Sequence, residues 1–332
     1  MSTMQRIFLQ EHEPIDFKFE QNKEDFIVDE IFAKPFKTKG NFLILHVKKV
    51  NMTTWDMIEK IAAFLNIPSS SIGYAGLKDK YATTTQYLSL PLKYERPLAR
   101  FKDPQITILK SFKDSKKISI GDLKSNRFKI RLHNVDDIKA GKIEKIARNI
   151  EKSGFPNYFG YQRFGQDSLA QAKEMVEGEL FIKDKKLKKF LVSVYQSDKF
   201  NQWLCERVNI SKASKNSTFE LLDGDVMIGE DDKLFTPKSP SVKDFTDKKI
   251  APTGLLVGRE VFRARDKARA IEEKYDDEHL AEKGLRRRAW IYPESLTCKY
   301  IRSDSVMELS FTLVKASYAT IFIENIANRN FG

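Results

Sequence analysis

The sequence predicts a mixed α/β protein of the α+β type, in which one lobe is interrupted by a large insertion. The chain has 332 residues, which is more than one domain usually contains. Strand-like alternation dominates roughly the first 130 residues and returns in Met307–Val314 (MELSFTLV). After Gly154 the pattern changes to long charged helical stretches and lysine-rich loops. The returning strand therefore predicts that the first lobe is completed after the insertion.

The first elements are expected to be two strands and a helix. Phe26–Ile31 alternates apolar and acidic residues, and Phe42–Val50 reads as a more buried strand. Thr53 is placed to cap a helix whose apolar residues recur at helical spacing from Trp55 to Leu65. The sequence Asn66-Ile67-Pro68 is expected to end that helix.

The remaining elements of this lobe follow the same two periodicities. Strands are expected at Gln86–Leu90, Gln105–Phe112 and Phe128–Leu132, and an amphipathic helix is expected at Val135–Lys152. A final helix is expected at Ser317–Asn328, directly after the returning strand.

Composition narrows the function classes. The 58 Lys and Arg outnumber the 46 Asp and Glu, and the net charge of +12 favours a polyanionic partner such as a nucleic acid. No apolar run approaches the roughly 18 residues that span a bilayer, so we expect no membrane segment and a cytoplasmic protein. The two cysteines and four scattered histidines lack metal-site spacing, and no cofactor motif occurs, so we expect neither a metal nor a cofactor.

The candidate catalytic group is Asp79, in a loop that reads GYAGLKDKYATTT. Lys78 and Lys80 flank it, and positive neighbours favour the ionised form of a carboxyl group. Asp79 is therefore expected to be a carboxylate that can act as a nucleophile or a base. Taken alone, a Gly-Leu-Lys-Asp stretch is more often an ordinary surface turn.

Two aromatic clusters strengthen the case for chemistry on RNA. The stretch NRFKIR places Phe128 among Arg127, Lys129 and Arg131, which suits stacking of a nucleobase with phosphate contacts beside it. An amphipathic strand with Phe128 in the core is the common alternative. The stretch NYFGYQRFG gathers four aromatic residues around Arg163, and it can be a core hinge or a base-binding wall equally well.

In this order and spacing, GYAGLKDKYATTTQ, SNRFKI and PNYFGYQRFG resemble the TruD family of tRNA pseudouridine synthases. The resemblance extends to EDFIVDEI, FNQ, DGD, PTG, RRRAW and SYAT, and so covers almost the whole chain. It implies a pseudouridine synthase catalytic domain at residues 1–156 and 298–332, built on a central, mostly antiparallel sheet. It also implies an inserted TRUD domain at residues 157–297.

The resemblance implies an isomerase that converts uridine to pseudouridine at position 13, in the D arm of glutamate tRNA, without an obligatory protein partner. Asp79 takes the place of the catalytic aspartate, and Asn126 and Phe128 of the N-x-F motif line the site. Basic residues are further candidates for contact with the RNA backbone, although basic runs are more often solvated: Lys183–Lys189, Arg286, Arg287 and Arg288.

One position departs from the family pattern. Family members often carry a lysine shortly before the EDF stretch, as the basic partner of the aspartate, and Glu20 stands there in this chain. Lys18 lies two residues away, on the same side of an extended strand, and Lys80 lies in the shared loop. These two lysines are the candidates for holding the carboxylate charged.

Two rival functions remain open on the sequence. A non-catalytic RNA-binding or RNA-folding protein on the same scaffold draws support from Glu20. A hydrolase with Asp79 as its nucleophile is the weaker rival, because no second catalytic residue is recognisable.

Overall fold

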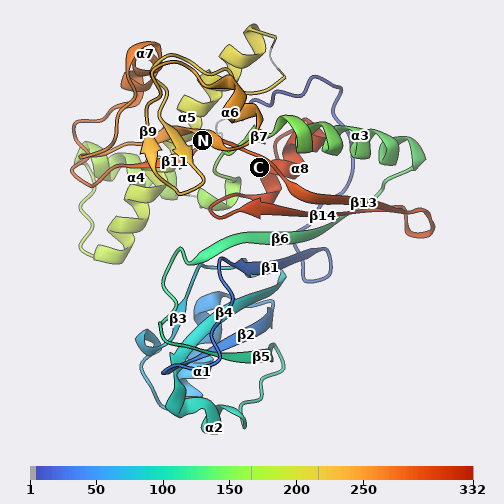
Figure 1. The fold of residues 1–332 in the computed structure, drawn as a ribbon, viewed down its shortest axis with the longest axis vertical. Helices are drawn as coiled ribbons and strands as arrows, with labels where there is room; N and C mark the ends of the chain where they lie inside the picture. The colour runs from blue at the N-terminus through green and yellow to red at the C-terminus, as the bar shows by residue number, and fades with distance from the viewer. Residues whose placement is uncertain (1–4, 166, 216, 332) are drawn as a thin grey trace. The chain divides into compact units, whose positions relative to one another are not determined.

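The computed structural model describes residues 5–165, 167–215 and 217–331, which form two compact units (Figure 1). The first, here the sheet unit, comprises Asp16–Glu144 and Pro293–Ala316. The second unit comprises the described residues of Met1–Ile15, Lys145–Tyr292 and Ser317–Gly332. Compact units reflect spatial contacts, whereas the expected domains reflect an insertion in the sequence, so those domain bounds remain a prediction. No helix among the described residues is long and apolar enough to cross a membrane.

The sheet unit is built on one eight-stranded sheet with the order β13-β14-β6-β1-β4-β2-β5, to which β3 adds by pairing with β4. Only β1 and β4 pair in parallel, so the expected mixed fold with a mostly antiparallel sheet is confirmed. The returning strand β14 pairs with β6, as expected for a sheet completed late in the chain. The strands are β1 (Phe26–Phe32), β2 (Phe42–Val50), β3 (Gly73–Tyr74), β4 (Thr83–Pro91), β5 (Ile106–Asp114), β6 (Leu123–Leu132), β13 (Glu294–Ile301) and β14 (Val306–Val314).

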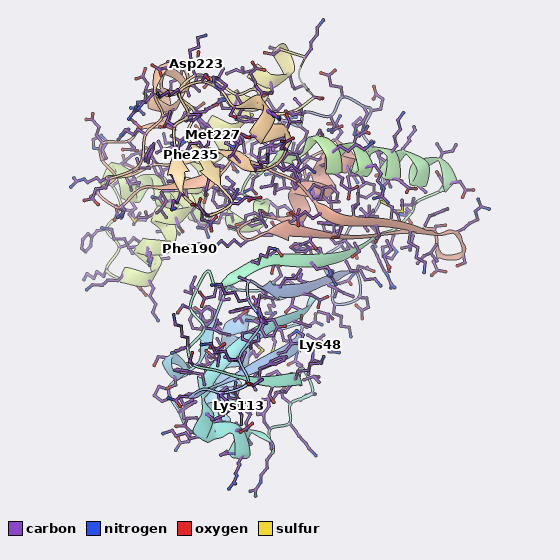
Figure 2. The ribbon with its side chains drawn as sticks, in the orientation of Figure 1. Lys48, Lys113, Phe190, Asp223, Met227 and Phe235 are labelled. Carbon is purple, nitrogen blue, oxygen red and sulfur yellow. The ribbon has the colours of Figure 1, made fainter. Side chains whose placement is uncertain are left out.

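Alternation gives the sheet two different faces. Leu43 and Val47 of β2 pack in the cluster that includes helix α1 (Thr54–Leu65), whereas Ile44 packs in a separate cluster. We call these the α1 face and the opposite face. Lys49 therefore belongs to the α1 face and its neighbour Lys48 to the opposite face. Figure 2 labels Lys48.

Helix α1 begins and ends where the sequence predicts. Thr53 accepts a hydrogen bond from the amide of Asp56 at 3.0 Å, and the Asp56 carboxylate accepts one from the amide of Thr53 at 2.9 Å. Asn66 adopts the left-handed conformation that ends the helix, with φ of 51°. The other helices are α2 (Glu95–Leu98), α3 (Asp137–Ser153), α4 (Ser168–Glu177), α5 (Lys185–Ala213), α6 (Val242–Thr246), α7 (Asp266–Glu272) and α8 (Ala319–Ala327).

The second unit centres on the long helix α5 and a small four-stranded sheet of order β11-β10-β8-β9. Gly254 of the PTG stretch lies so close to α5 that an added Cβ would come within 2.2 Å of the Trp203 ring, so glycine is needed there. The short strands are β7 (Phe155–Pro156), β8 (Met227–Gly229), β9 (Leu234–Phe235), β10 (Ile250–Leu256), β11 (Leu285–Arg288) and β12 (Trp290–Ile291), of which β7 pairs with β12.

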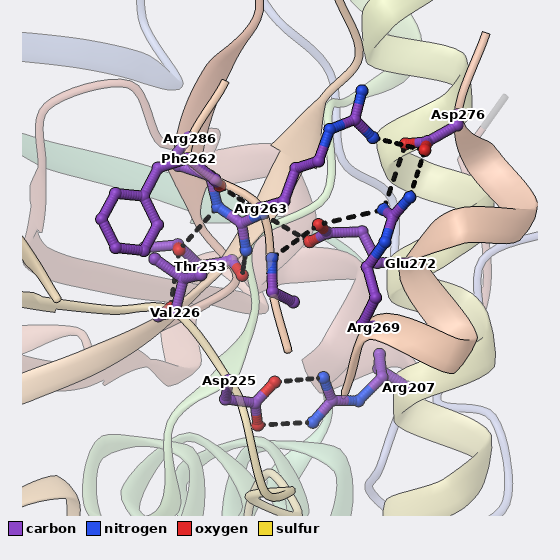
Figure 3. Close-up of polar contacts among 11 residues, drawn as sticks. Arg207, Asp225, Val226, Thr253, Phe262, Arg263, Arg269, Glu272, Asp276 and Arg286 are labelled. Atoms are coloured by element: carbon purple, nitrogen blue, oxygen red, sulfur yellow. Dashed lines mark hydrogen bonds and ion pairs between the residues drawn. The ribbon is translucent and has the colours of Figure 1, made fainter. Parts of the chain in front are cut away.

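Buried ion pairs hold this unit together (Figure 3). The guanidinium group of Arg207 binds both carboxylate oxygens of Asp225, at 2.6 and 2.9 Å, and the two side chains are 0% and 5% exposed. Nearby, Arg286 binds Glu272, and both of these side chains are almost fully buried. Because the charges are desolvated, each depends on its partner.

Removing one partner of the buried pair should therefore be costly. We expect Asp225→Ala to lower the free energy of unfolding by about 3–5 kcal/mol, because it leaves the Arg207 charge buried and unpaired. The matched control is Asp223→Ala, since Asp223 lies two residues away, is half exposed, and meets Lys267 only at 3.6 Å (Figure 2). Urea denaturation would measure both variants, and equal losses would contradict the assignment.

Candidate active site

A buried lysine supports the loop that carries Asp79. Lys49, on the α1 face of β2, is 0% exposed. Its ammonium group donates hydrogen bonds to the backbone carbonyl oxygens of Met52 and Asp79, both at 2.7 Å. Burial lowers the pKa of Lys49 from 10.5 to about 8, and the charge of Asp79 opposes that change. Lys49 thus ties the backbone of Asp79 to the centre of the sheet.

Asp79 itself remains accessible to solvent. Desolvation nevertheless raises the pKa of its carboxyl group above 3.8, while the charges of Lys49 and Lys78 act in the opposite direction. The pKa of Asp79 is therefore raised, whereas the flanking lysines alone predict a lowered pKa. The residue as a whole is exposed, so the loop can be approached from solvent, whereas the carboxyl group itself is poorly hydrated. An accessible, poorly hydrated carboxylate is a stronger base than one at an ordinary surface.

Two further contacts fix the loop. The ammonium group of Lys78 pairs with Glu30 of β1 at 2.6 Å, and these side chains are 5% and 0% exposed. The amide of Lys78 donates to the hydroxyl oxygen of Thr54 at 3.0 Å, and this hydroxyl donates to the side-chain oxygen of Gln86 at 2.9 Å. The loop is therefore held by β1, by the start of α1 and by β4, as well as by Lys49.

Strand register places Phe128 on the same face as this loop. Lys49 pairs with Thr84, Thr84 with Val28, and Val28 with Phe128, so these residues form one row across β2, β4, β1 and β6. Three strand spacings separate the Cα atoms of Lys49 and Phe128, or about 14 Å. Asn126 lies two residues from Phe128 and pairs with Glu30, so it shares this face.

Three buried polar atoms near this row have no hydrogen-bond partner among the described residues. They are the side-chain oxygens of Asn126 and Thr84 and the amide nitrogen of Gln86. An unsatisfied buried polar atom costs about 1–3 kcal/mol, and in a native protein it calls for an explanation, of which a catalytic role is one. Thr84 and Gln86 are fully buried, whereas Asn126 is only half-buried and can be approached from solvent.

Phe128 occupies a core position in this structure. Its ring stacks on Phe311 with centroids 5.6 Å apart and meets Phe26 edge-on at 6.1 Å. Only 5% of the residue is exposed. The core alternative left open by the sequence therefore describes this ring, and its stacking on a nucleobase remains a prediction.

The two lysines proposed as the basic partner of Asp79 make other contacts. The ammonium group of Lys18 pairs with Glu20 at 3.0 Å, and both side chains are more than half exposed. The ammonium group of Lys80 lies over the ring of Tyr81, 5.4 Å from its centroid. The lysine that contacts the backbone of the Asp79 loop is Lys49, for which no sequence motif gave an indication. Its only signal was a charged residue on the strand face that is otherwise formed by Leu43, Leu45 and Val47.

The basic residues of β6 lie on the opposite face of the sheet. Arg127, Lys129 and Arg131 alternate with Asn126 and Phe128, and alternate residues of a strand point to opposite sides. Lys129 and Arg131 share Glu308 of β14, at 3.0 and 3.1 Å. They are therefore not grouped with Asp79, and their contact with RNA remains a prediction for another surface.

Two arginines expected at an RNA surface are buried in the second unit. The side chain of Arg286 is 2% exposed and binds Glu272. Arg287 donates to the carbonyl oxygen of Asn157 and lies 3.9 Å from the centroid of the Phe159 ring. The expectation that these two arginines contact RNA phosphates is corrected, because neither guanidinium group faces solvent. Both instead hold the fold.

Arg163 is half-buried and makes internal contacts in the same unit. It donates to the hydroxyl group of Ser197 at 3.2 Å and lies over the rings of Phe159 and Phe190. In this structure the aromatic NYFGYQRFG stretch packs internally, as the core-hinge alternative implies. Contact of Arg163 with RNA remains a prediction.

The described residues contain no group of three or more His, Cys, Asp or Glu side chains arranged to hold a metal ion.

Comparison with known proteins identifies the family. The family model described as tRNA pseudouridine synthase D (TruD) matches residues 3–181 and 167–326. The chain belongs to the TruD family. The tRNA pseudouridine synthase D of a Nitratiruptor species is 42% identical over 356 residues, covering 98% of this chain and 99% of that protein. The protein of the same name from Wolinella succinogenes is 37% identical with the same coverage.

A solved structure shares the TruD fold. The crystal structure of a putative tRNA pseudouridine synthase D from Methanosarcina mazei has a TM-score of 0.72 and 20% sequence identity. The match covers 98% of this chain and 96% of that chain. At this identity the comparison establishes the fold.

Replacing Lys49 should disturb the loop without removing the carboxylate. We expect Lys49→Met to lower the single-turnover rate of pseudouridine formation in a tRNA transcript by at least about tenfold, because hydrogen bonds from a charged donor are worth roughly 1.5–3 kcal/mol. Lys48→Met is the matched control, since Lys48 is the adjacent lysine on the opposite face. Equal rates for the two variants would contradict the role of Lys49.

The effect of Lys49 should also depend on pH. Lys49 is charged below its pKa of about 8 and loses its proton as the pH rises through that value. The rate advantage of the wild type over Lys49→Met should therefore be full near pH 7 and shrink above pH 8. Single-turnover rates between pH 6 and 9.5 would measure it, and a constant ratio across that range would rule out a charged anchor.

Proposed function

We propose that this TruD protein isomerises uridine to pseudouridine at position 13, in the D arm of tRNA(Glu), with Asp79 as its catalytic carboxylate. One observation carries the proposal: Asp79, an exposed residue, stands on a loop anchored by the buried Lys49, on the same sheet face as the unsatisfied Asn126. Relatives that match over almost their full length bear the name tRNA pseudouridine synthase D, which supports the activity and the class of substrate.

The reaction rearranges a nucleoside without adding or removing atoms. The bond between C1′ of the ribose and N1 of uracil breaks, the base turns, and C1′ forms a bond with C5. The proton on C5 is lost and N1 gains one, so no electron acceptor and no water are consumed. The demands on the protein are a group that acts at the ribose and a surface that holds the detached base.

Asp79 meets the first demand. Its carboxylate either adds to C1′ as a nucleophile or removes the proton from C2′ to give a glycal, and both routes need the ionised group beside the ribose. Desolvation raises its pKa and so increases its basicity, while Lys49 and Lys78 favour the charged form. The anchored backbone keeps the carboxylate in place while the base turns.

Asn126 meets the second demand. Its buried side-chain oxygen accepts no hydrogen bond from the described residues, and N3–H of uracil is a donor of the matching kind. A uridine in a tRNA arm must leave its stack to reach this position, at a cost of a few kcal/mol. Contacts of the basic protein with phosphates offset that cost.

The structure weakens the argument for a non-catalytic RNA-binding protein. That rival relied on Glu20 standing where the family often has lysine. Lys49 supplies a basic group to the Asp79 loop from a different strand, so a lysine at position 20 is not required for that purpose. A site that has lost its chemistry has no need for a costly buried lysine beneath an accessible carboxyl group.

The decisive variant is Asp79→Asn, which preserves the shape of the side chain and removes its charge. We expect it to bind a tRNA(Glu) transcript as the wild type does and to form no pseudouridine, as measured by carbodiimide labelling and primer extension. Asp304→Asn, at an exposed aspartate of the sheet unit, is the control and should remain fully active.

Each outcome of that experiment has a distinct meaning. Full activity in Asp79→Asn would refute the catalytic assignment. If the wild-type protein binds the transcript but forms no pseudouridine, the result would favour the RNA-folding rival. Pseudouridine at a position other than 13 would leave the catalytic assignment of Asp79 intact and overturn the proposed target uridine.

A further inference from the structure

A basic recess in the sheet unit has no part in the chemistry proposed above. It has a volume of about 410 Å³ and is lined by 13 residues from β1, β2, the end of β5 and their adjoining loops. Phe32, Phe36 and Ile44 contribute apolar surface. Four lysines also line it: Lys34, Lys37, Lys116 and Lys117. We call this site the lysine recess.

The charge of the lysine recess is available to a ligand. Its two acidic residues are engaged with backbone amides: Asp114 accepts from Ser115 at 2.6 Å, and Asp122 accepts from Ser119 at 2.7 Å. All four lysines are exposed. No described residue forms an ion pair with Lys34 or Lys116, so two cationic groups are free to bind an anion.

The aromatic rings continue from the recess across the opposite face of the sheet. The ring centroids of Phe32 and Phe36 are 4.7 Å apart, and those of Phe36 and Tyr87 are 5.0 Å apart. Tyr87 in turn stacks on His46 at 4.6 Å, with only 16° between the ring planes. These rings are half-buried, so their packing holds them in place while part of each remains accessible.

Cations beside fixed aromatic rings suit single-stranded nucleic acid. Phosphates meet the lysines, and a base stacks on a ring without regard to its sequence. An acidic peptide would use the cations but would have no need of the rings. RNA is therefore the ligand class that uses both features of the recess.

The recess is also close in structure to the base of the catalytic loop. Ala75, four residues before Asp79, packs in one cluster with Ile44 and Ile118, which both line the recess. The carbonyl oxygen of Ala75 accepts a hydrogen bond from the amide of Gly121 at 2.8 Å. The recess and the start of the catalytic loop are therefore packed together.

We propose that the lysine recess binds a nucleotide of the substrate RNA other than the reacting uridine. Its base packs against Phe36, and its phosphate lies between Lys34 and Lys116. This inference rests on the proposed function only in taking RNA as the ligand, because it requires no chemistry at Asp79.

The electrostatic part is tested by Lys34→Glu combined with Lys116→Glu, with a tRNA(Glu) transcript as the probe. We expect the Kd to rise about tenfold and the slope of log K against log salt to become shallower by roughly 0.7, because one phosphate contact is lost. The single-turnover rate at saturating RNA should stay unchanged, since neither lysine touches the reacting uridine.

The matched control is Arg96→Glu combined with Arg100→Glu. This pair makes the same change of charge at exposed positions in and just after α2 of the same unit. The proposal is overturned if the recess variant and the control have the same Kd and the same salt slope.

The stacking part is tested at Phe36. We expect Phe36→Ala to weaken binding of the transcript about tenfold, because stacking of one base on an aromatic ring is worth roughly 1–3 kcal/mol. Phe36→Tyr should bind the transcript with the affinity of the wild type, since tyrosine keeps an aromatic ring at this position. Thermal unfolding of both variants would show whether the fold is intact. Wild-type affinity in Phe36→Ala would contradict base binding.

These measurements separate the recess from the catalytic proposal. Binding is read without catalysis, so the recess is tested even if the wild-type protein forms no pseudouridine. Unchanged affinity and normal pseudouridine formation in the Lys34→Glu, Lys116→Glu double variant and in Phe36→Ala would refute RNA binding at the recess. The role of Asp79 would then remain intact.

Discussion

The catalytic site depends on the buried ammonium group of Lys49. An ammonium group in the interior of a sheet is expensive to desolvate, and Lys49 offsets the cost with two carbonyl oxygens and the charge of Asp79. The arrangement works in both directions. The loop supplies one of these oxygens, from Asp79, and the turn after β2 supplies the other, from Met52. In return, Lys49 ties the loop to β2. A carboxylate on an unanchored loop would lose much of its value, because a small displacement from the ribose costs a large part of the rate.

The pleat of the sheet then decides which residues can act together. The row from Lys49 to Phe128 gathers the candidate catalytic residues on the α1 face, and the alternation of β6 sends Arg127, Lys129 and Arg131 to the other side. Basic residues adjacent to the N-x-F motif in sequence are thus separated from it in space. The lysine recess, linked to the catalytic loop through Ala75, offers a different place for RNA beyond the reacting uridine.

Local sequence patterns were sufficient to predict the strands and helices. They were not sufficient to predict which residues distant in the sequence meet in the fold. The strand Phe42–Val50 and the Thr53 cap follow directly from side-chain periodicity and capping chemistry. The parallel pairing of β1 with β4 has no local signal, because it depends on how distant strands meet. Arg286 and Arg287 read as a solvated basic run, yet Glu272 and Asn157, distant in sequence, bury them. The role of Lys49 could not be predicted for the same reason, because its partners come from the turn after β2 and from the Asp79 loop.

The most direct test of the Lys49 anchor is amide hydrogen exchange in the wild type and in Lys49→Met, with peptides that cover the Asp79 loop compared with peptides from β2 and β4. The anchor predicts that exchange in residues 77–82 becomes at least about tenfold faster in the variant while the two strands stay protected. Unchanged protection of the loop in a folded Lys49→Met protein would contradict the account, because the carboxylate would then be held in place by something other than the buried ammonium group.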